Sequence, residues 1–170
     1  MKLKSILSIL ALSALIYSCG DDDNNDPFDG VPSSEIVDVE LREATLTGSS
    51  ESSSSRELAV GDQKWWKQKI SKVQYSGECG GAEDQELTDG YYYGFYPSGE
   101  YYAKSGKDGT PVRAGSWQWV DGDKDAIYIS SVTFTLRGLN DDELIIASDQ
   151  SQGPCSAITW EQFNQPYIEE

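Results

Sequence analysis

From residue 58 onward, short runs rich in β-branched and aromatic residues alternate with turn signals, and no run has the apolar spacing of a long amphipathic helix. Runs of this kind at short intervals are typical of an antiparallel sandwich or barrel. They predict an all-β domain over residues 58–170, with about eight strands and short connections. The runs fall at residues 64–75, 91–96, 100–103, 115–120, 126–129, 132–136, 143–147 and 155–163.

Two local features refine this prediction. Pro97, Ser98 and Gly99 separate two aromatic runs. Proline presets its own φ and glycine accepts a positive φ, so this turn predicts a hairpin. Gly94 lies between bulky neighbours inside a strand-like run, which predicts a bulge or a bend there.

The order of these runs resembles a known family. A first strand with tryptophans is followed by the aromatic hairpin, by "AGSWQWVDGDKDAIYI" and by "FTLRGLNDDELII". Over residues 64–163 this order is similar to the lipocalin-like domains of many small lipoproteins of gram-negative bacteria. The resemblance implies a small antiparallel up-and-down β-barrel, lipocalin-like and of about eight strands. Lipocalins carry Gly-x-Trp on the first strand, whereas Gly61 precedes Trp65 by four positions here, so the resemblance implies the architecture rather than a particular ligand.

The N-terminus has the pattern of a targeting signal. Two lysines precede an apolar stretch, residues 6–17, that is too short to cross a bilayer, because a spanning helix takes about 20 residues. This pattern predicts a signal peptide over residues 1–18. The Ile-Tyr-Ser-Cys sequence that ends at Cys19 resembles the lipobox of bacterial lipoproteins, which implies that Cys19 carries a diacylglyceryl group and an N-acyl chain such as palmitate. The other interpretation is an uncleaved signal anchor with an incidental cysteine.

Lipidation at Cys19 predicts a permanent membrane anchor, because stable binding takes two or more acyl chains. The acidic run at residues 21–26 resembles the signal with which some gram-negative bacteria move lipoproteins to the outer face of the outer membrane. We therefore expect a lipid-anchored outer-membrane protein displayed at the cell surface. A solvated spacer on a periplasm-facing protein is the other interpretation.

Residues 19–57 have the composition of a tether, since they hold eleven acids against two arginines and include a serine run. Residues 36–42 alternate apolar and charged side chains, which is compatible with an edge strand on the domain or with a helix that begins after Ser34. Both interpretations stay open. Removing the signal peptide with its two lysines changes the net charge from −16 to −18, which argues against nucleic-acid binding.

The three cysteines have different predicted roles. With Cys19 assigned to lipid, Cys79 and Cys155 remain as an even pair in an oxidising compartment, and such pairs usually form a disulfide. Two buried free thiols are the other interpretation.

The composition argues against most enzyme classes. The chain has no histidine, which removes the usual general base and the commonest transition-metal ligand. Asp121, Asp123 and Asp125 have the opening spacing of a calcium loop, but Ala126 and Val132 stand where that loop needs glycine and glutamate. We therefore expect a non-enzymatic protein without a cofactor or a dedicated metal site.

Aromatic residues are the remaining candidates for a binding site. Trp117 and Trp119 alternate on one strand, so both must share a face, which in a small barrel is the packed lumen or the wall of a pocket. Tyr91, Tyr93 and Phe95 share one face of their strand. These five residues are the predicted wall of a pocket for a small apolar or amphipathic ligand.

Two further tyrosines, Tyr92 and Tyr96, share the opposite face of that strand, so one of the two sets must lie outside the barrel. Exposed aromatic stripes often mark interfaces. The second hypothesis is therefore a module that recognises a glycan or a partner protein in a cell-surface assembly, and a purely structural role is the third.

Overall fold

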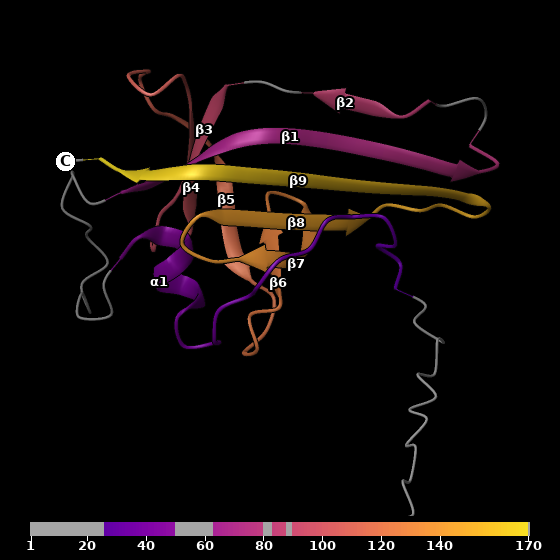
Figure 1. The fold of residues 1–170 in the computed structure, drawn as a ribbon, viewed down its shortest axis with the longest axis horizontal. Coiled ribbons are helices and arrows are strands. Elements are labelled where there is room, and N and C mark those ends of the chain that lie inside the picture. Colours follow the sequence, from indigo (N-terminus) through magenta and orange to yellow (C-terminus); the bar gives the residue numbers. More distant parts are fainter. Residues whose placement is uncertain (1–25, 50–62, 80–82, 88–89, 170) are drawn as a thin grey trace, which may run out of the picture.

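The computed structural model describes residues 26–49, 63–79, 83–87 and 90–169. These residues form one short helix and a single antiparallel sheet that closes on itself through the pairing of its first and last long strands (Figure 1). The predicted all-β architecture, an eight-stranded up-and-down barrel, is confirmed. The elements are α1 (Arg42–Thr47), β1 (Lys64–Gly77), β2 (Gln85–Leu87), β3 (Tyr91–Phe95), β4 (Glu100–Ser105), β5 (Val112–Trp119), β6 (Ala126–Ile129), β7 (Val132–Leu139), β8 (Glu143–Asp149) and β9 (Cys155–Ile168).

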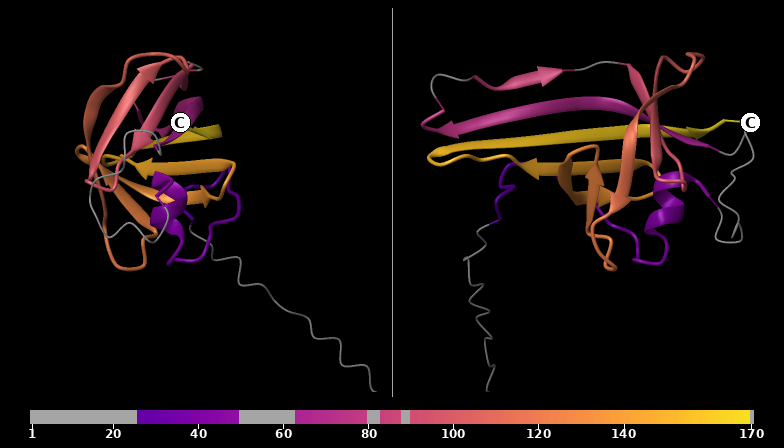
Figure 2. Two further views of the ribbon diagram at one scale, coloured as in Figure 1. Left: turned by 90° about the vertical axis from the view of Figure 1, so that its left-hand side faces the viewer. Right: turned by 180° about the vertical axis from the view of Figure 1, so that it is seen from behind.

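The barrel consists of β1 and β3 to β9, each paired with the next strand along the chain. β1 and β9 are each 14 residues long and pair from Lys64 with Ile168 to Gly77 with Cys155. They extend beyond the barrel as a ribbon, and β2 pairs with the outer edge of β1 on that extension (Figures 1 and 2). Closure gives each barrel strand a paired neighbour on both sides, which removes the two open edges that a flat sheet would have.

The predicted disulfide between Cys79 and Cys155 is confirmed, with the two Cα atoms 4.6 Å apart. It lies at the far end of the ribbon, next to the pairing of Gly77 with Cys155. Gly77 has a φ of +79°, and a β-carbon there would lie 2.2 Å from the carbonyl oxygen of Pro154. Glycine therefore allows the end of β1 and the start of β9 to approach closely enough for the disulfide.

The core fills the barrel with side chains from alternate positions of its strands, as the pleat of a β-strand requires. A second, smaller cluster lies outside the barrel wall, where Phe28 and Val31 pack against Ala147 and Trp160. The buried members of the interior cluster are Leu46, Trp66, Phe95, Trp117, Ile127, Phe134, Leu136, Leu139, Leu144, Ile146 and Phe163.

Part of the segment expected to be a tether packs on the barrel instead. Phe28 is buried in the outer cluster, and the Arg137 guanidinium lies over its ring while pairing with Asp26 at 2.9 Å. Leu46 of α1 is fully buried in the interior cluster. The acidic, serine-rich composition concealed these few apolar anchors, so residues 26–49 belong to the folded unit rather than to a tether.

Residues 36–42 form neither a helix after Ser34 nor a full edge strand. Ile36 makes one parallel bridge with Leu139. β6 pairs with β7 only as far as Thr135, so the last residues of β7 have an edge that the N-terminal segment covers. Ser34 N–H donates to the Arg137 carbonyl, and Leu139 N–H donates to the Glu35 carbonyl. The chain then turns into α1, six residues long.

The sequence predicted a bulge or a bend at Gly94, and of these the bulge is absent, because the pairing of Gly94 with Trp65 and Tyr102 continues the register in both neighbouring strands. Its small size instead admits the Trp65 ring, which a β-carbon at position 94 would approach to 3.2 Å. Trp65 lies on the outer face of β1 and is fully buried there, with the Lys104 ammonium 4.2 Å from the ring centroid. The register shifts fall between Trp65 and Lys67, Gln68 and Ile70, Tyr101 and Tyr102, and Leu136 and Gly138.

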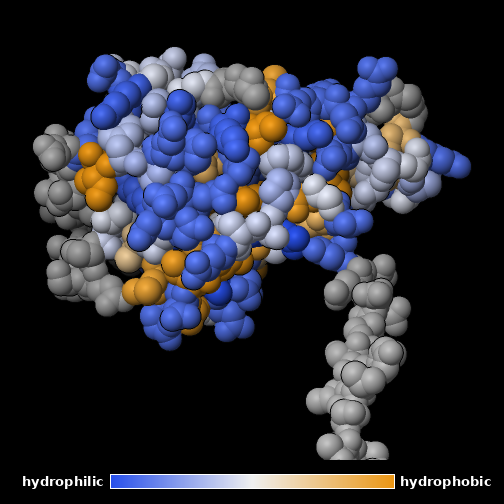
Figure 3. All heavy atoms as spheres, viewed as in Figure 1, coloured by the Kyte–Doolittle hydropathy of each residue, from blue (hydrophilic) through white to orange (hydrophobic). Residues whose placement is uncertain are grey.

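The surface seen in Figure 3 is largely hydrophilic, with hydrophobic residues showing between polar ones. The most exposed large hydrophobic side chains are Val112 and Leu87. Within the part of the chain that the structure describes, no helix is both long and apolar enough to cross a membrane.

Candidate ligand-binding cavity

A cavity of about 220 Å³ lies inside the barrel. Its aromatic wall consists of Tyr93, Phe95, Tyr101, Phe134 and Phe163. Ile129, Val132, Ile146, Ser130 and Glu161 complete the lining. The cavity reaches the β6–β7 turn, whereas α1 packs at the other end of β7, so the cavity and the helix occupy opposite ends of that strand.

The aromatic side chains of the wall contact one another. The Tyr93 ring lies edge-on to Phe163 at 5.6 Å, and Phe95 stacks on Tyr101 at 5.9 Å between centroids. The hydroxyl oxygens of Tyr101 and Ser130 are 3.4 Å apart. These contacts hold the rings in place around the cavity.

Gly115 of β5 makes room for this wall. It pairs with Tyr101, and a β-carbon there would lie 2.7 Å from Tyr101 Cε1 and 2.3 Å from Ser130 Oγ. Any larger side chain would displace these residues, both of which line the cavity. The glycine of the Gly-Ser-Trp triplet therefore has a steric role that spacing alone did not indicate.

Glu161 brings a carboxylate to this mainly apolar lining. The alternation of β9 places Trp160 in the outer cluster and Glu161 on the lumen side. The buried Gln68 side chain on β1 donates a hydrogen bond to Glu161 Oε2 at 3.4 Å. Among the described residues that line the cavity, Glu161 is the only one with an acidic or basic side chain.

The five predicted pocket residues are distributed over three places. Tyr93 and Phe95 line the cavity. Tyr91 begins β3, is 42% exposed and is not part of the lining. Trp117 and Trp119 do share a face, as predicted, with their rings perpendicular at 5.7 Å, but they lie at a different hollow.

That second hollow is a groove of about 460 Å³ beside the β3–β4 turn. Trp117 Nε1 donates to the Tyr96 carbonyl at 2.9 Å, which ties the groove floor to the turn. The Lys124 ammonium lies 5.8 Å from the Trp119 ring and pairs with Glu43 of α1 at 3.2 Å. The groove is lined by Glu43, Pro97, Ser98, Gly99, Ser116, Trp117, Gln118, Trp119 and Tyr128.

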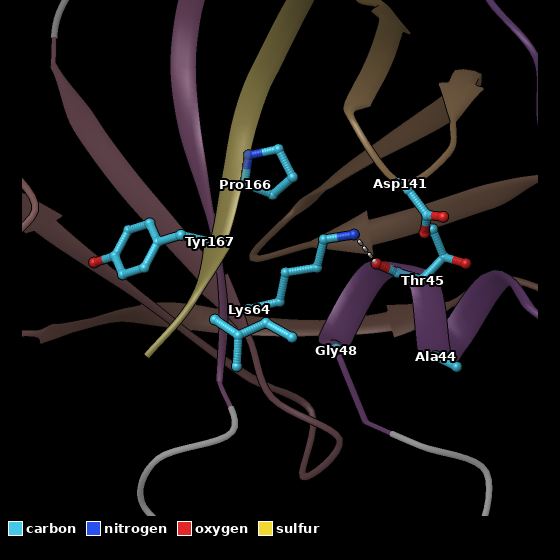
Figure 4. A pocket seen from close by; sticks show the side chains of 8 residues that line it. Ala44, Thr45, Gly48, Lys64, Asp141, Pro166 and Tyr167 are labelled. Atoms are coloured by element: carbon cyan, nitrogen blue, oxygen red, sulfur yellow. Dashed lines mark hydrogen bonds between the residues drawn. The ribbon is translucent and has the colours of Figure 1, made fainter. Parts of the chain in front are cut away.

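A third cleft, of about 420 Å³, lies where α1 meets the start of β1 and the end of β9 (Figure 4). Lys64 points from β1 toward α1, where its Nζ donates to the Thr45 carbonyl at 3.0 Å and lies 4.1 Å from the Trp66 ring centroid. Burial lowers the pKa of Lys64, while Asp141 and Asp142 partly oppose that shift. These contacts join the helix to the barrel end.

The tyrosines on the opposite face of β3 form outer ring pairs. Tyr92 contacts Tyr167 edge-on at 5.5 Å, and Tyr96 packs against Tyr102 at 4.9 Å. Both are half-buried by these neighbours rather than freely exposed. The sequence prediction that one tyrosine set faces outward is therefore confirmed, with Tyr92 and Tyr96 as that set.

The aspartates of the β5–β6 turn are engaged separately. Asp121 accepts a hydrogen bond from the Lys124 backbone at 3.0 Å, and Asp125 pairs with Arg42. Within the described ranges, no cluster of three cysteine or acidic residues is arranged to hold a metal ion. Cys19, the predicted lipidation site, lies outside the described residues.

Comparison with protein-family models, with curated proteins and with solved structures found no match for this chain. The barrel and the chemistry of its cavity are therefore the basis on which a function can be assigned. Sequence reasoning identified Tyr93 and Phe95 but missed Tyr101, Phe163 and Glu161. The alternation of residues 155–163 was the available signal for the last two.

Proposed function

We propose that this chain is a lipid-anchored lipoprotein with a lipocalin-like domain whose barrel binds a small apolar or amphipathic ligand without chemical conversion. The observation that carries the proposal is the cavity of about 220 Å³ with its mainly aromatic and aliphatic wall. Small-molecule sites are concave and mostly apolar, with few polar groups. An engineered apolar cavity of about 150 Å³ already binds benzene.

The volume also limits the ligand. It is about one and a half times that of the engineered cavity of about 150 Å³ that binds benzene. A compact molecule or one compact end of a larger molecule fits this volume, whereas a long acyl chain does not. The proposed ligand is therefore small.

The proposed location follows from the signal peptide and from Cys19, and it is an outer membrane with display at the cell surface. The folded unit adds a geometric argument, because it includes residues from Asp26 onward. Seven residues of extended chain span at most about 25 Å. Lipidation at Cys19 would therefore hold the barrel close to the bilayer rather than on a long tether.

Native mass spectrometry tests the proposal. The chain from Gly20 to Glu170 is exported into an oxidising compartment without the lipid and is purified gently. An additional mass that leaves on denaturation supports the carrier function and begins to identify the cargo. If the bare chain also fails to bind small apolar and amphipathic probes at millimolar concentration, the carrier function is wrong.

The groove at Trp119 favours a second candidate function, recognition of a glycan. Trp119 and the 37% exposed Tyr128 stand there among polar side chains, including Ser98, Gln118 and Glu43. Aromatic rings with neighbouring hydrogen-bonding groups suit sugar rings, which have apolar faces and polar edges. Screening on a glycan array tests this function, and Trp119→Ala should abolish any signal while leaving ligand binding in the barrel cavity unchanged.

A further inference from the structure

We propose that the ligand of the barrel cavity carries a positive charge, and that it is a small ammonium compound whose cation lies between the aromatic wall and the Glu161 carboxylate. This inference rests on the proposed function, because it specifies the ligand of the same cavity. Three observations carry it: the position of the carboxylate, the composition of the wall and the charge of the chain.

The position of Glu161 is set by the barrel itself. Its neighbour Trp160 is anchored in the outer cluster with Phe28, and Phe163 is buried in the interior cluster, so the strand presents Glu161 to the lumen. Gln68 on the adjacent strand holds one carboxylate oxygen at 3.4 Å. A carboxylate offers about four lone-pair sites, and its charge attracts a cation whether or not its oxygens accept other hydrogen bonds, so the contact with Gln68 is compatible with a nearby cation.

The wall beside this carboxylate is aromatic. Tyr93 and Phe163 meet edge to face, Tyr101 stacks on Phe95, and all four residues line the cavity. The negative face of an aromatic ring attracts a cation, most strongly when the cation is desolvated, and aromatic cages are the usual recognition site for quaternary ammonium groups. The apolar surroundings also strengthen attraction to the carboxylate, because the local dielectric constant is low.

The charge of the cavity lining disfavours anionic ligands. The described lining residues include the Glu161 carboxylate and no lysine or arginine. A fatty acid or a phosphate would therefore enter without a cationic partner from the lining. The formal net charge of −16 adds a long-range field that raises the local concentration of cations and weakens with salt.

Three probes of nearly the same shape separate charge from size. Choline, its neutral carbon isostere 3,3-dimethylbutan-1-ol and the anion 3,3-dimethylbutanoate are each titrated into the chain from Gly20 to Glu170 by isothermal calorimetry at low salt. We expect choline to bind at least about tenfold more tightly than the neutral isostere, a difference of about 1.4 kcal/mol. The anion should bind more weakly than both.

Glu161→Gln keeps the shape of the side chain and removes its charge. We expect this variant to lose about tenfold in choline affinity while its affinity for the neutral isostere stays within about twofold, since one charge pair is removed. Glu86→Gln is the matched control, because Glu86 lies on β2, outside the cavity, and pairs only distantly with Lys72 at 3.9 Å. It removes the same net charge and should leave choline binding unchanged.

The outcomes distinguish this inference from the proposed function. Equal binding of choline and the neutral isostere overturns the positive charge but leaves the carrier function standing. Binding of none of the three probes at millimolar concentration counts against both. An equal loss of all three probes in Glu161→Gln assigns Glu161 a purely structural role, and if that variant does not fold, the comparison of probes on the unmodified chain still decides the question.

Discussion

The indole N–H of Trp66 donates a hydrogen bond to the backbone carbonyl of Leu46, 2.9 Å away, and so joins α1 to the interior of the barrel. The helix has only six residues, and isolated helices of this length are unstable in water. Its stability therefore comes from the barrel end that it covers. Figure 2 shows α1 across that end.

This contact predicts that the helix contributes strongly to the stability of the barrel. Leu46→Ala should lower the free energy of unfolding by about 2–5 kcal/mol, because it removes a fully buried side chain and leaves a cavity. Urea unfolding followed by tryptophan fluorescence measures the change. Leu41→Ala is the control, since Leu41 is 45% exposed and should change stability by less than about 0.5 kcal/mol. A small effect at Leu46 would mean that α1 does not stabilise the barrel.

The disulfide predicts a stability that depends on redox conditions. Cys79 and Cys155 are 76 residues apart, and the chain-entropy model gives about 4–5 kcal/mol for a loop of this size. Replacing both with serine should lower the free energy of unfolding toward that amount, and adding reductant to the unmodified chain should do the same. Choline affinity should stay constant, because neither cysteine lines the cavity. A parallel loss of choline affinity would show that the ribbon shapes the lumen.

The ion pair between the buried Lys104 ammonium and the partly exposed Glu169 carboxylate, 3.0 Å apart, predicts a loss of stability at alkaline pH. Burial alone would lower the pKa of Lys104, but hydrogen bonds and charge attraction from Tyr167 and Glu169 outweigh it and raise the pKa above 10.5. A raised pKa means that this stabilisation is complete below pH 10.5 and is lost as pH rises through the folded-state value. The stability difference between the unmodified chain and Lys104→Met should therefore be constant below pH 10.5 and shrink above it.

Lys64 should show the opposite sign. Its pKa is lowered from 10.5, chiefly by burial, so the unfolded chain binds more protons than the folded chain between the lowered value and pH 10.5. Stability of the unmodified chain relative to Lys64→Met should therefore increase as pH rises toward 10.5. Urea unfolding of both variants across this range provides the comparison, and the same pH trend in both would contradict the assignment of causes.

Gly115 predicts how the cavity responds to a single methyl group. Gly115→Ala should lower choline affinity about tenfold, because the new β-carbon displaces Tyr101 and Ser130, and it should cost about 1–3 kcal/mol of stability. Titration calorimetry and urea unfolding measure the two effects. Gly122→Ala is the matched control, because no atom lies within 4 Å of its added β-carbon. Unchanged choline affinity in Gly115→Ala would place the ligand away from Tyr101.

The local sequence pattern was sufficient to predict part of this structure. The two-residue alternation that predicted a strand over residues 132–136 reappears in β7, with Phe134 and Leu136 both buried inside the barrel. The pairing of Cys79 with Cys155 followed from the number of cysteines and from the expected oxidising compartment. The period of a strand is visible within a few residues, and the two cysteines that remain after Cys19 can pair in only one way.

The candidate binding site was harder to predict from the local sequence pattern. The sequence showed that Trp117 and Trp119 share a face and that Tyr93 and Phe95 do, but it did not show that these pairs would border different hollows. The sequence predicted a bulge or a bend at Gly94, whereas the small size of this residue makes room for the ring of Trp65 on the neighbouring strand. Each of these outcomes depends on the stagger between strands, which no single strand encodes.

The sequence by itself therefore determined the strands, the turn at Pro97 and Gly99, and the disulfide, because propensity, period and cysteine number are local or countable properties. Only the tertiary structure decided that residues 26–49 join the barrel and that Glu161 faces an aromatic cavity. The physical reason is that both depend on contacts between distant segments: Phe28 packs against Trp160, and closure of β1 against β9 brings Gln68 to Glu161 across 93 positions of sequence.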